Sequence, residues 1–334
     1  MKTDRKSLLS KLLAVAPAVA SKGIMEQGQC FLFRKGRAAA FDGEVACFAD
    51  VGLEADCAVP AKPLLDLLGK LPEDEIDVEF TDSELNVKGK RRKSGIRLEA
   101  KVVNPIDGVG EPGKWRSLPD GFSEACDLVR RCCSSDQSQF VITCVHVTPE
   151  YVEASDRFQI ARHAVESGIE PCMVRAKALA VAAKSKPTEF SDGEEWLHFR
   201  NADGIRVSVR RYPDKFPLLE KHLEIEGRAV KLLKESDLKG LLDRAGIFAD
   251  EDREYVTVEL RPGKLKVTAR GSQGWYSEVG DVGFDGDPLS FTVAPEVLLE
   301  VVRRTEQVIV SEKRLAADAG PLRFVVCTGR PKDG

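Results

Sequence analysis

The sequence predicts an α+β fold made of three similar domains, on the basis of three observations. Two sets of amphipathic helices recur along the chain at a common interval of about 115 residues. Each helix of the second set is followed by segments in which apolar and polar residues alternate, which is the pattern of antiparallel strands. The chain has 334 residues, 43% of them hydrophobic and 31% charged, so it can bury a core in each of several domains.

The helices are expected at corresponding places in each repeat. The first set lies at 6–16, 120–133 and 236–248, and the second set lies at 59–68, 174–183 and 293–302. In every repeat the first helix precedes the second by about fifty residues. Because two independent markers share one interval, we interpret the pattern as an internal repeat.

The strands and the domain boundaries follow from the segments between these helices. Alternating patterns separated by Asp-Gly and similar turns predict strands, and the clearest of them are 76–80, 84–88, 95–99, 196–199, 205–209, 307–310 and 322–326. Boundaries are expected near 105–114, which is rich in Gly and Pro, and near 223–227. We therefore predict one domain in each of residues 1–112, 113–223 and 224–334.

Several classes of protein are disfavoured. The nine cysteines match neither a disulfide framework nor a zinc site, and they are expected to be buried, reduced thiols of a cytoplasmic protein. The N-terminus resembles a signal peptide, but Asp4, Lys11 and Pro17 interrupt that pattern, and the segment fits the first helix of the first repeat. No apolar run approaches the ~20 residues of a membrane helix, so no membrane partner is expected.

No motif for catalysis, metal binding or cofactor binding stands out. The stretch from Gly108 to Lys114 matches the start of a phosphate-binding loop, but Trp115 follows where Ser or Thr is needed. The four histidines are isolated, and His146 and His198 lie in strand-like segments, so they are expected to be structural. We predict no cofactor and no enzymatic activity. An enzyme on an α+β scaffold stays as an alternative, which a titratable cluster in a cleft would support.

Positive charge recurs at matching helix positions. Lys184 and Arg303 lie ten residues after Val174 and Val293, where the second-helix patterns begin, and Arg304 follows. In the first repeat, where the pattern begins at Val59, the same place holds Gly69 and Lys70. A single pair would be an ordinary solvated face, and that interpretation stays open. Recurrence in three repeats favours a regular polyanion as a partner, which is compatible with a formal net charge of −4 if the basic strip is local.

Taken together, the sequence resembles the bacterial β-type DNA polymerase sliding clamps, in a divergent or phage-like form. The resemblance spans essentially the whole chain and is carried mainly by the order and spacing of four segments, at 59–72, 154–160, 211–219 and 323–326. It implies a head-to-tail homodimeric ring, with strands outside and helices lining a channel around duplex DNA. It also implies a non-catalytic processivity factor that binds DNA without sequence preference. A DNA polymerase and a clamp loader would bind it through a short linear motif.

The resemblance also assigns residues to three surfaces. The expected DNA contacts are Lys22, Lys70, Gln137, Lys177, Lys184, Arg303 and Arg304. The expected peptide pocket comprises Ser155, Arg157, Phe158, Gln159, Ile160, Pro217, Lys221, His222, Val325 and Cys327. The expected dimer interface comprises Ile96, Leu98, Ile247 and Phe248.

The pocket departs from the usual pattern of the family at two places. Arg157 stands where a glycine is usual, and the chain continues from Cys327 as Thr-Gly-Arg-Pro in place of the usual terminus. The expected partner peptide therefore differs from the common bacterial one. A clamp-like ring that tethers a factor unrelated to replication stays as an alternative.

Overall fold

The computed structural model describes residues 1–23, 25–249 and 255–330. The chain divides into two compact units, and each is described by itself. The first unit comprises Met1–Arg131, Cys144–Glu150 and Val165–Lys215, and the second comprises Cys132–Thr143, Tyr151–Ala164 and Phe216–Gly334. These two units are defined by contacts and not by sequence repeats, so the division into three domains at 1–112, 113–223 and 224–334 stays a prediction.

The first unit contains four α-helices and two antiparallel sheets among its described residues. Its helices are α1 (Arg5–Val15), α2 (Ala61–Lys70), α3 (Phe122–Val129) and α4 (Ala176–Lys184), with short 3-10 helices η1 (Ala16–Ala18), η2 (Pro105–Val109) and η3 (Arg130–Cys132). One sheet has the order β1 (Lys2–Asp4), β4 (Glu75–Phe80), β5 (Glu84–Lys88) and β6 (Lys93–Arg97). In order of pairing, the larger sheet contains β2 (Cys30–Phe41), β3 (Val45–Pro60), β14 (Arg206–Tyr212), β13 (Trp196–Arg200), β12 (Glu189–Asp192) and β7 (Arg116–Ser117). Strand β14 also pairs with β11 (Cys172–Arg175), and β11 pairs in turn with β8 (Cys144–Val147).

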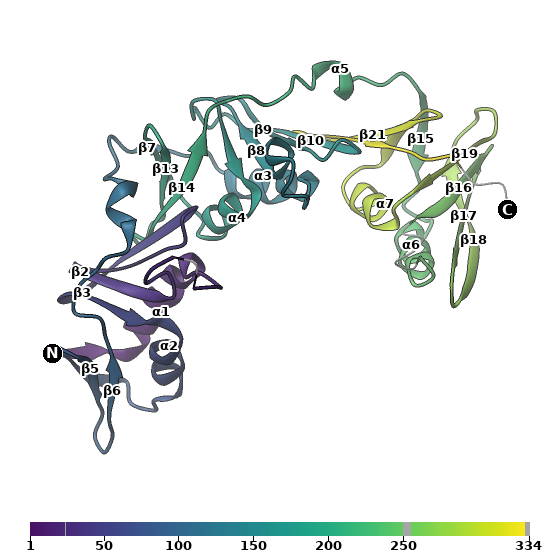
Figure 1. The fold of residues 1–334 in the computed structure, drawn as a ribbon. Helices are drawn as coiled ribbons and strands as arrows, with labels where there is room; N and C mark the ends of the chain where they lie inside the picture. Colours follow the sequence, from purple (N-terminus) through teal and green to yellow (C-terminus); the bar gives the residue numbers. More distant parts are fainter. Residues whose placement is uncertain (24, 250–254, 331–334) are drawn as a thin grey trace. The chain divides into compact units, whose positions relative to one another are not determined.

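The second unit is built around one long run of paired antiparallel strands. In order of pairing these are β9 (Tyr151–Ser155), β10 (Gln159–Ala164), β22 (Leu322–Cys327), β21 (Arg314–Ala319), β20 (Gln307–Val310), β15 (Arg228–Leu232), β18 (Gly274–Gly283), β17 (Lys264–Gly271), β16 (Val256–Arg261) and β19 (Leu289–Val293). Its helices are α5 (Glu220–Leu223), α6 (Leu238–Gly246), α7 (Pro295–Val302) and the 3-10 helix η4 (Phe140–Thr143). In Figure 1, α5 lies on the opposite side of β10 and β21 from α7.

The α+β class and all six predicted helices are confirmed. The helices pack in three pairs, because α1 contacts α2, α3 contacts α4 and α6 contacts α7. The seven predicted strands are also present, and 84–88 and 307–310 match at both ends while the ends of the others agree to within three residues. No helix in the described part of the chain is long and apolar enough to cross a bilayer.

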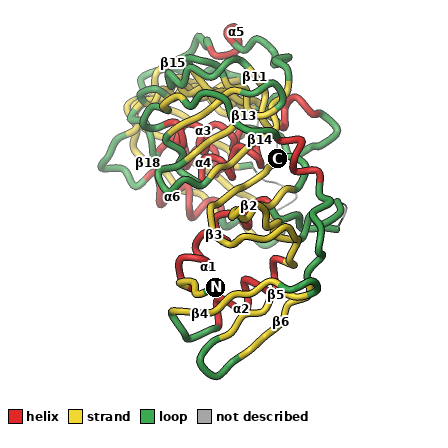
Figure 2. Tube along the Cα trace, turned by 90° about the vertical axis from the view of Figure 1, so that its left-hand side faces the viewer, coloured by secondary structure: helices red, strands yellow, loops and turns green. Residues whose placement is uncertain are grey.

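The start of the chain shows why the first helix forms. The Asp4 carboxylate accepts a hydrogen bond from the backbone N–H of Ser7 at 2.6 Å and caps α1. Leu8, Leu12 and Val15 recur at helical spacing and are buried. Figure 2 shows α1 and α2 beside the strands of the first unit. The segment that resembles a signal peptide is therefore part of a folded core.

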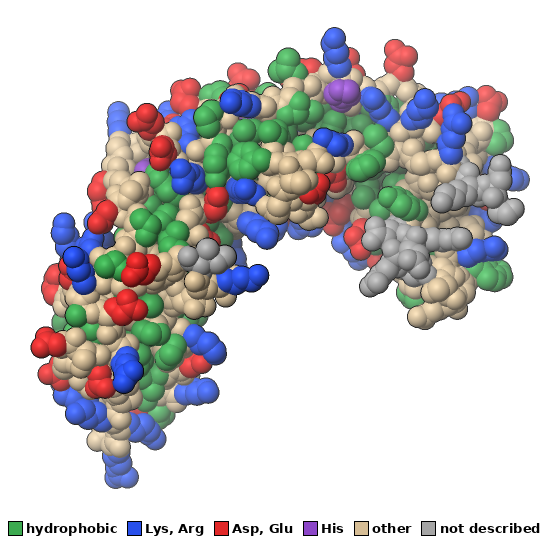
Figure 3. All heavy atoms as spheres, viewed as in Figure 1, with side chains coloured by type: hydrophobic (Ala, Val, Ile, Leu, Met, Phe, Trp, Pro, Cys, Tyr) green, Lys and Arg blue, Asp and Glu red, His purple; other side chains and the backbone are tan. Residues whose placement is uncertain are grey.

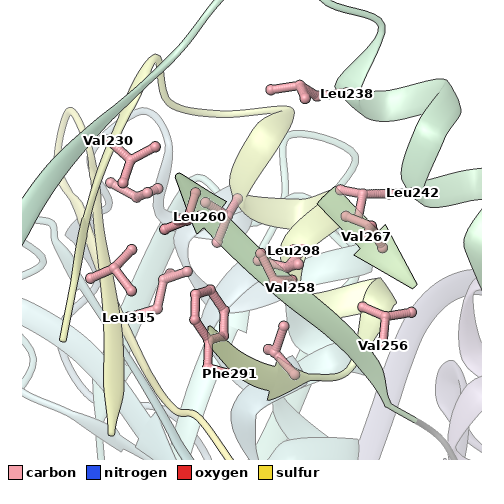
Figure 4. Close-up of a cluster of buried hydrophobic side chains, with 14 of the residues drawn as sticks. Val230, Leu238, Leu242, Val256, Val258, Leu260, Val267, Phe291, Leu298 and Leu315 are labelled. Carbon is pink, nitrogen blue, oxygen red and sulfur yellow. The ribbon is translucent and has the colours of Figure 1, made fainter. Parts of the chain in front are cut away.

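The core of the second unit shows the same principle. Leu238, Leu241 and Leu242 on one face of α6 pack with Leu298 and Val301 of α7 over the sheet, and Figure 4 shows part of this cluster around Phe291. Strand β18 passes closely under α6 at Gly280, where an added Cβ would come within 2.9 Å of Leu238. The even-numbered side of β18 therefore faces the helices, and its odd-numbered side faces away from them.

The cysteines and histidines largely follow expectation. Seven of the nine cysteines are buried, and burial raises the pKa of the Cys47 thiol to about 12. Cys327 is exposed, so the expectation of burial is wrong for that thiol. His146 and His198 are both buried in strands, and His198 Nδ1 lies 2.8 Å from the Ser208 hydroxyl.

His198 makes the stability of the first unit sensitive to acid. Burial, with a further contribution from Arg206, lowers the pKa of His198 to about 4. As pH falls below about 6.5, His198 becomes protonated in the unfolded chain, but in the folded chain it stays neutral until about pH 4. We expect this histidine to remove up to about 3 kcal/mol of stability across that range. Denaturant unfolding from pH 7.5 to 4 should show a flatter pH dependence in His198→Gln, and an unchanged one would contradict this assignment.

Candidate nucleic-acid and partner interfaces

The lysines predicted to contact DNA lie on exposed helix surfaces. Lys70 ends α2 and Lys184 ends α4, and both are exposed. Lys177 is also exposed and lies seven residues, or about two turns, before Lys184, so the two share a helix face. Among the described residues, none of these three lysines has a carboxylate within ion-pair distance. Cations at a helix C-terminus also complement the helix dipole, which is the ordinary explanation for two of the positions.

The remaining predicted DNA contacts are less available. Arg303 and Arg304 follow α7, but each is within 3.4 Å of the Glu300 carboxylate. Lys22 is exposed in the loop before β2, and the Gln137 amide donates to the Ser135 carbonyl at 3.2 Å. Lys70, Lys177 and Lys184 are therefore the strongest candidates.

The predicted peptide pocket lies within the second unit, on the outer face of its sheet. Ile160 on β10 is directly opposite Val325 on β22 and Ser155 on β9, and all three side chains are buried. Arg162, two residues from Ile160 and so on the same face, binds Glu153 of β9 at 2.7 Å and Glu220 of α5 at 3.0 Å. These ion pairs hold α5 over that face of the sheet.

A tight turn between β9 and β10 carries two of the residues predicted to line the pocket, Arg157 and Phe158, and leads into a third, Gln159, at the start of β10. The Asp156 carboxylate accepts from the backbone N–H groups of Phe158 and Gln159 at 2.9 and 2.8 Å. Arg157 has a left-handed φ of 82°, so the arginine keeps a backbone conformation that suits the usual glycine, at a cost in strain. The Phe158 carbonyl accepts from the Cys327 backbone N–H at 2.7 Å, which ties this turn to the last strand.

The exposed rim of the pocket differs from its predicted floor. The Phe158 side chain is 72% exposed and projects from the turn, whereas Ile160 and Val325, which were predicted to line the same floor, are buried. Pro217, Lys221 and His222 are exposed on the segment that carries α5. Leu218 is 87% exposed beside them and was missed, although the Pro-Leu-Leu run at 217–219 contains it. The rim thus combines two exposed apolar side chains with positive charge.

The predicted dimer residues do not all lie at the surface. Ile247 is 75% exposed at the end of α6. Phe248 is half-buried and stacks on Tyr276 with ring centroids 6.0 Å apart, so it packs mainly within its own unit. Ile96 on β6 and Leu98, which follows that strand, are half-buried.

Two exposed apolar residues on β18 extend this surface and were not predicted. Trp275 and Val279 are 65% and 56% exposed on the side of the strand that faces away from α6. Their spacing of four residues in an alternating strand was the available signal. Over 274–281, β18 pairs only with β17, and β6 pairs only with β5. Both strands therefore present open edges in the described structure.

Neither metal-binding nor phosphate-loop geometry is present in the described residues. No group of three or more His, Cys, Asp or Glu side chains is placed to hold a metal there. The stretch from Gly108 to Lys114 begins at the end of η2 and is followed by strand β7, and no helix starts at Lys114. It therefore lacks the helix N-terminus that binds phosphate in such a loop.

The whole chain has the fold of the β-type DNA sliding clamps. No family model and no curated protein matches the sequence, but solved structures match over nearly its full length. The DNA polymerase III subunit beta from Pseudomonas aeruginosa has 20% identity and a TM-score of 0.84, covering 99% of this chain and 100% of that one. The corresponding subunit from Thermotoga maritima has 17% identity and a TM-score of 0.80, with 99% of each chain covered. The griselimycin-bound sliding clamp from Bartonella birtlesii has 14% identity and a TM-score of 0.86, again with 99% of each covered.

Proposed function

We propose that this chain is a non-catalytic DNA sliding clamp, which encircles duplex DNA and tethers a polymerase to its template in the cytoplasm. The observation that carries the proposal is the clamp fold over 99% of the chain, combined with exposed lysines on α2 and α4 that have no ion-pair partner among the described residues. Phosphate contacts by such lysines are independent of sequence and let a protein slide. Retention on nicked circular DNA, with release when the circle is cut, tests encirclement directly. Equal retention on circular and linear DNA would contradict it.

The ring would close by head-to-tail pairing of two copies. The open edge of β6 in one copy would pair with the open edge of β18 in the other, which satisfies the unpaired backbone groups of both strands. Trp275 and Val279 would be covered at this junction. Ile247, at the end of α6, lies near the start of β18, because its neighbour Phe248 is close to Gly274. Because the two surfaces differ, the contact is heterologous and has to close into a ring to avoid filaments.

Charge favours an antiparallel arrangement of these edges. The turn before β6 carries Lys90 and Arg91, Lys93 begins the strand, and all three are exposed. Lys and Arg side chains gather at this end of the first unit (Figure 3). Exposed Asp281 and Asp285 lie near the end of β18. Antiparallel pairing would bring the basic start of β6 to the acidic end of the partner's β18, which would orient the encounter.

The pocket on β10 and β22 would hold the short linear motif of a polymerase or clamp loader. A buried aliphatic floor with an exposed aromatic rim suits an extended peptide with one or two apolar anchors. The basic rim, which includes Arg157 and Lys221, favours a peptide that also carries acidic residues. If the chain tethers a factor unrelated to replication, peptides from that factor would bind here in place of polymerase peptides.

We expect Ile160→Arg to weaken binding of C-terminal peptides from the cognate polymerase by at least about thirtyfold, because a charge would enter the apolar floor. Fluorescence polarisation measures the change. Phe158→Ser removes an exposed side chain without disturbing the fold and should also weaken binding, whereas Gln307→Arg, on an exposed site of β20, should not. Unchanged affinity in both Ile160→Arg and Phe158→Ser would exclude this pocket as the partner site.

A further inference from the structure

The first unit has a groove of its own, which the clamp role described above does not use. It is a cavity of about 1010 Å³ on the face of β2 and β3 that lies beneath η2. Its floor is apolar and includes Leu32, Val102 and Ile106, and its walls carry Arg34, Arg37 and Arg206. Because all of these residues belong to the first unit, the groove is a property of that unit alone.

Arg206 is the unusual residue of this groove. Its side chain is only 9% exposed, and its guanidinium carbon lies 3.7 Å from the centre of the Phe48 ring. Nη1 donates to the Glu111 carboxylate at 2.7 Å, while the buried Nε–H has no hydrogen-bond partner among the described residues. A buried guanidinium with an unsatisfied donor is costly unless a carboxylate compensates it.

Glu111 is a weakly held partner for this arginine. Its side chain is 72% exposed, and its other near contact is Arg37 Nη1 at 3.6 Å. It follows Gly110, which has a left-handed φ of 69°, on the segment that runs across the groove. Because Glu111 is exposed, an incoming carboxylate can reach the buried Arg206 and replace that of Glu111, so that the guanidinium keeps a compensating charge throughout.

The charges of the walls limit what can bind. Arg34 is already held by Asp107 at 2.8 Å and by Asp56 at 3.3 Å. If Glu111 moves aside, Arg37 and Arg206 have no carboxylate partner among the described residues. Three other carboxylates, those of Glu54, Asp56 and Asp107, still line the cavity. One additional carboxylate is therefore favourable, whereas the closely spaced charges of a nucleic acid backbone would be repelled.

The groove also corresponds to the pocket of the second unit through the internal repeat. On β3 and β14, Arg206 pairs with Phe48 and Ser208 pairs with Ala46. On β10 and β22, Arg323 pairs with Arg162 and Val325 pairs with Ile160. In each place a short helix covers the outer face, with Ile106 and Val109 of η2 buried on Ala46 as α5 packs on β22. The same architecture thus forms a groove twice.

We propose that this groove of the first unit binds an extended peptide of a partner protein that carries an aliphatic side chain and a single carboxylate. The aliphatic group lies on the floor beside Leu32 and Ile106. The carboxylate takes the place of Glu111 on Arg206 and Arg37. Glu111 then acts as an internal competitor, which keeps the groove closed to weak acidic ligands.

The probe for the test is an array of capped hexapeptides that contain Leu, Val, Ala and one Asp in every order between two glycines, with a parallel array in which Asn replaces Asp. The full chain is applied to both arrays, and fluorescence polarisation then gives the Kd of the peptides retained. We expect binding to Asp peptides over their Asn counterparts. Glu111→Gln should lower the Kd about two- to fivefold, and Arg206→Met should raise it about tenfold or more.

Two controls separate this groove from other sites. Glu166→Gln removes an exposed carboxylate of the first unit that lies outside the cavity and has no ion pair in the described chain, and it should leave the Kd unchanged. Leu218→Asp alters the pocket of the second unit and should also leave it unchanged, and a loss of binding there would assign the peptides to that pocket. The proposal is overturned if Asn and Asp peptides bind alike, if neither the parent nor Glu111→Gln binds any peptide, or if Glu111→Gln brings no gain. None of these outcomes bears on retention of the chain on circular DNA.

Discussion

Replacing Lys70, Lys177 and Lys184 together with alanine should flatten the salt dependence of DNA binding. Each phosphate contact contributes about 0.9 to the slope of log K against log salt, so losing three contacts per protomer lowers the slope by about three. Those lysines are exposed on α2 and α4 without ion-pair partners in the described structure, so their removal disturbs little of the fold. Equilibrium binding to short linear duplexes, from which a ring can dissociate, gives the slope between about 50 and 200 mM salt, on the order of physiological ionic strength.

A matched variant separates local contacts from total charge. Lys2, Lys114 and Lys313 are exposed and lie outside the helices, so replacing them with alanine changes the net charge equally. If only the helix lysines lower the slope, α2 and α4 face DNA. If both triple variants lower it equally, overall charge is responsible and the assignment of these helices is wrong.

Replacing Trp275 with Ser and Val279 with Asp should convert the ring into monomers. Both side chains are exposed on an open strand edge, and burying an anchor of this kind at an interface typically contributes at least about 2 kcal/mol. Together with a charge placed on the edge, the double substitution should raise the dissociation constant of the dimer by a factor on the order of a thousand. Sedimentation velocity at micromolar concentration would then show a single species of the monomer mass.

The control for this variant removes exposed apolar surface elsewhere. Leu13 on α1 and Val103 are 53% and 45% exposed, and Leu13→Ser with Val103→Asp should leave the dimer intact. A dimer that persists in the Trp275 and Val279 variant would exclude the β18 edge as the junction. The pair Ile96→Ala and Phe248→Ala, suggested by the resemblance, is less specific because Phe248 packs on Tyr276 within its own unit.

The helices and their repetition could be predicted from the sequence because their signals are local. An apolar stripe such as Leu238, Leu241 and Leu242 needs only neighbouring turns of one helix to be recognised. Strand alternation around Val325 is local in the same way. The lysines that end α2 and α4 could be found because the helices recur at one interval, so that Lys70 and Lys184 fall within one residue of the same place in the pattern.

Only the tertiary structure determines which of these elements pair with or contact one another. Arg206 and Glu111 are 95 residues apart, and no local pattern indicates that a buried guanidinium would contact an exposed carboxylate of the linker. Ile160 and Val325 become a floor because β10 pairs with β22, while Phe158, two residues earlier, stays in water because the turn at Asp156 directs it outward. Trp275 and Val279 are significant because, in the part of the chain that the structure describes, β18 has no second partner strand over 274–281. Composition and periodicity specify each element, but the pairing of strands distant in sequence determines which faces and edges remain available to a partner.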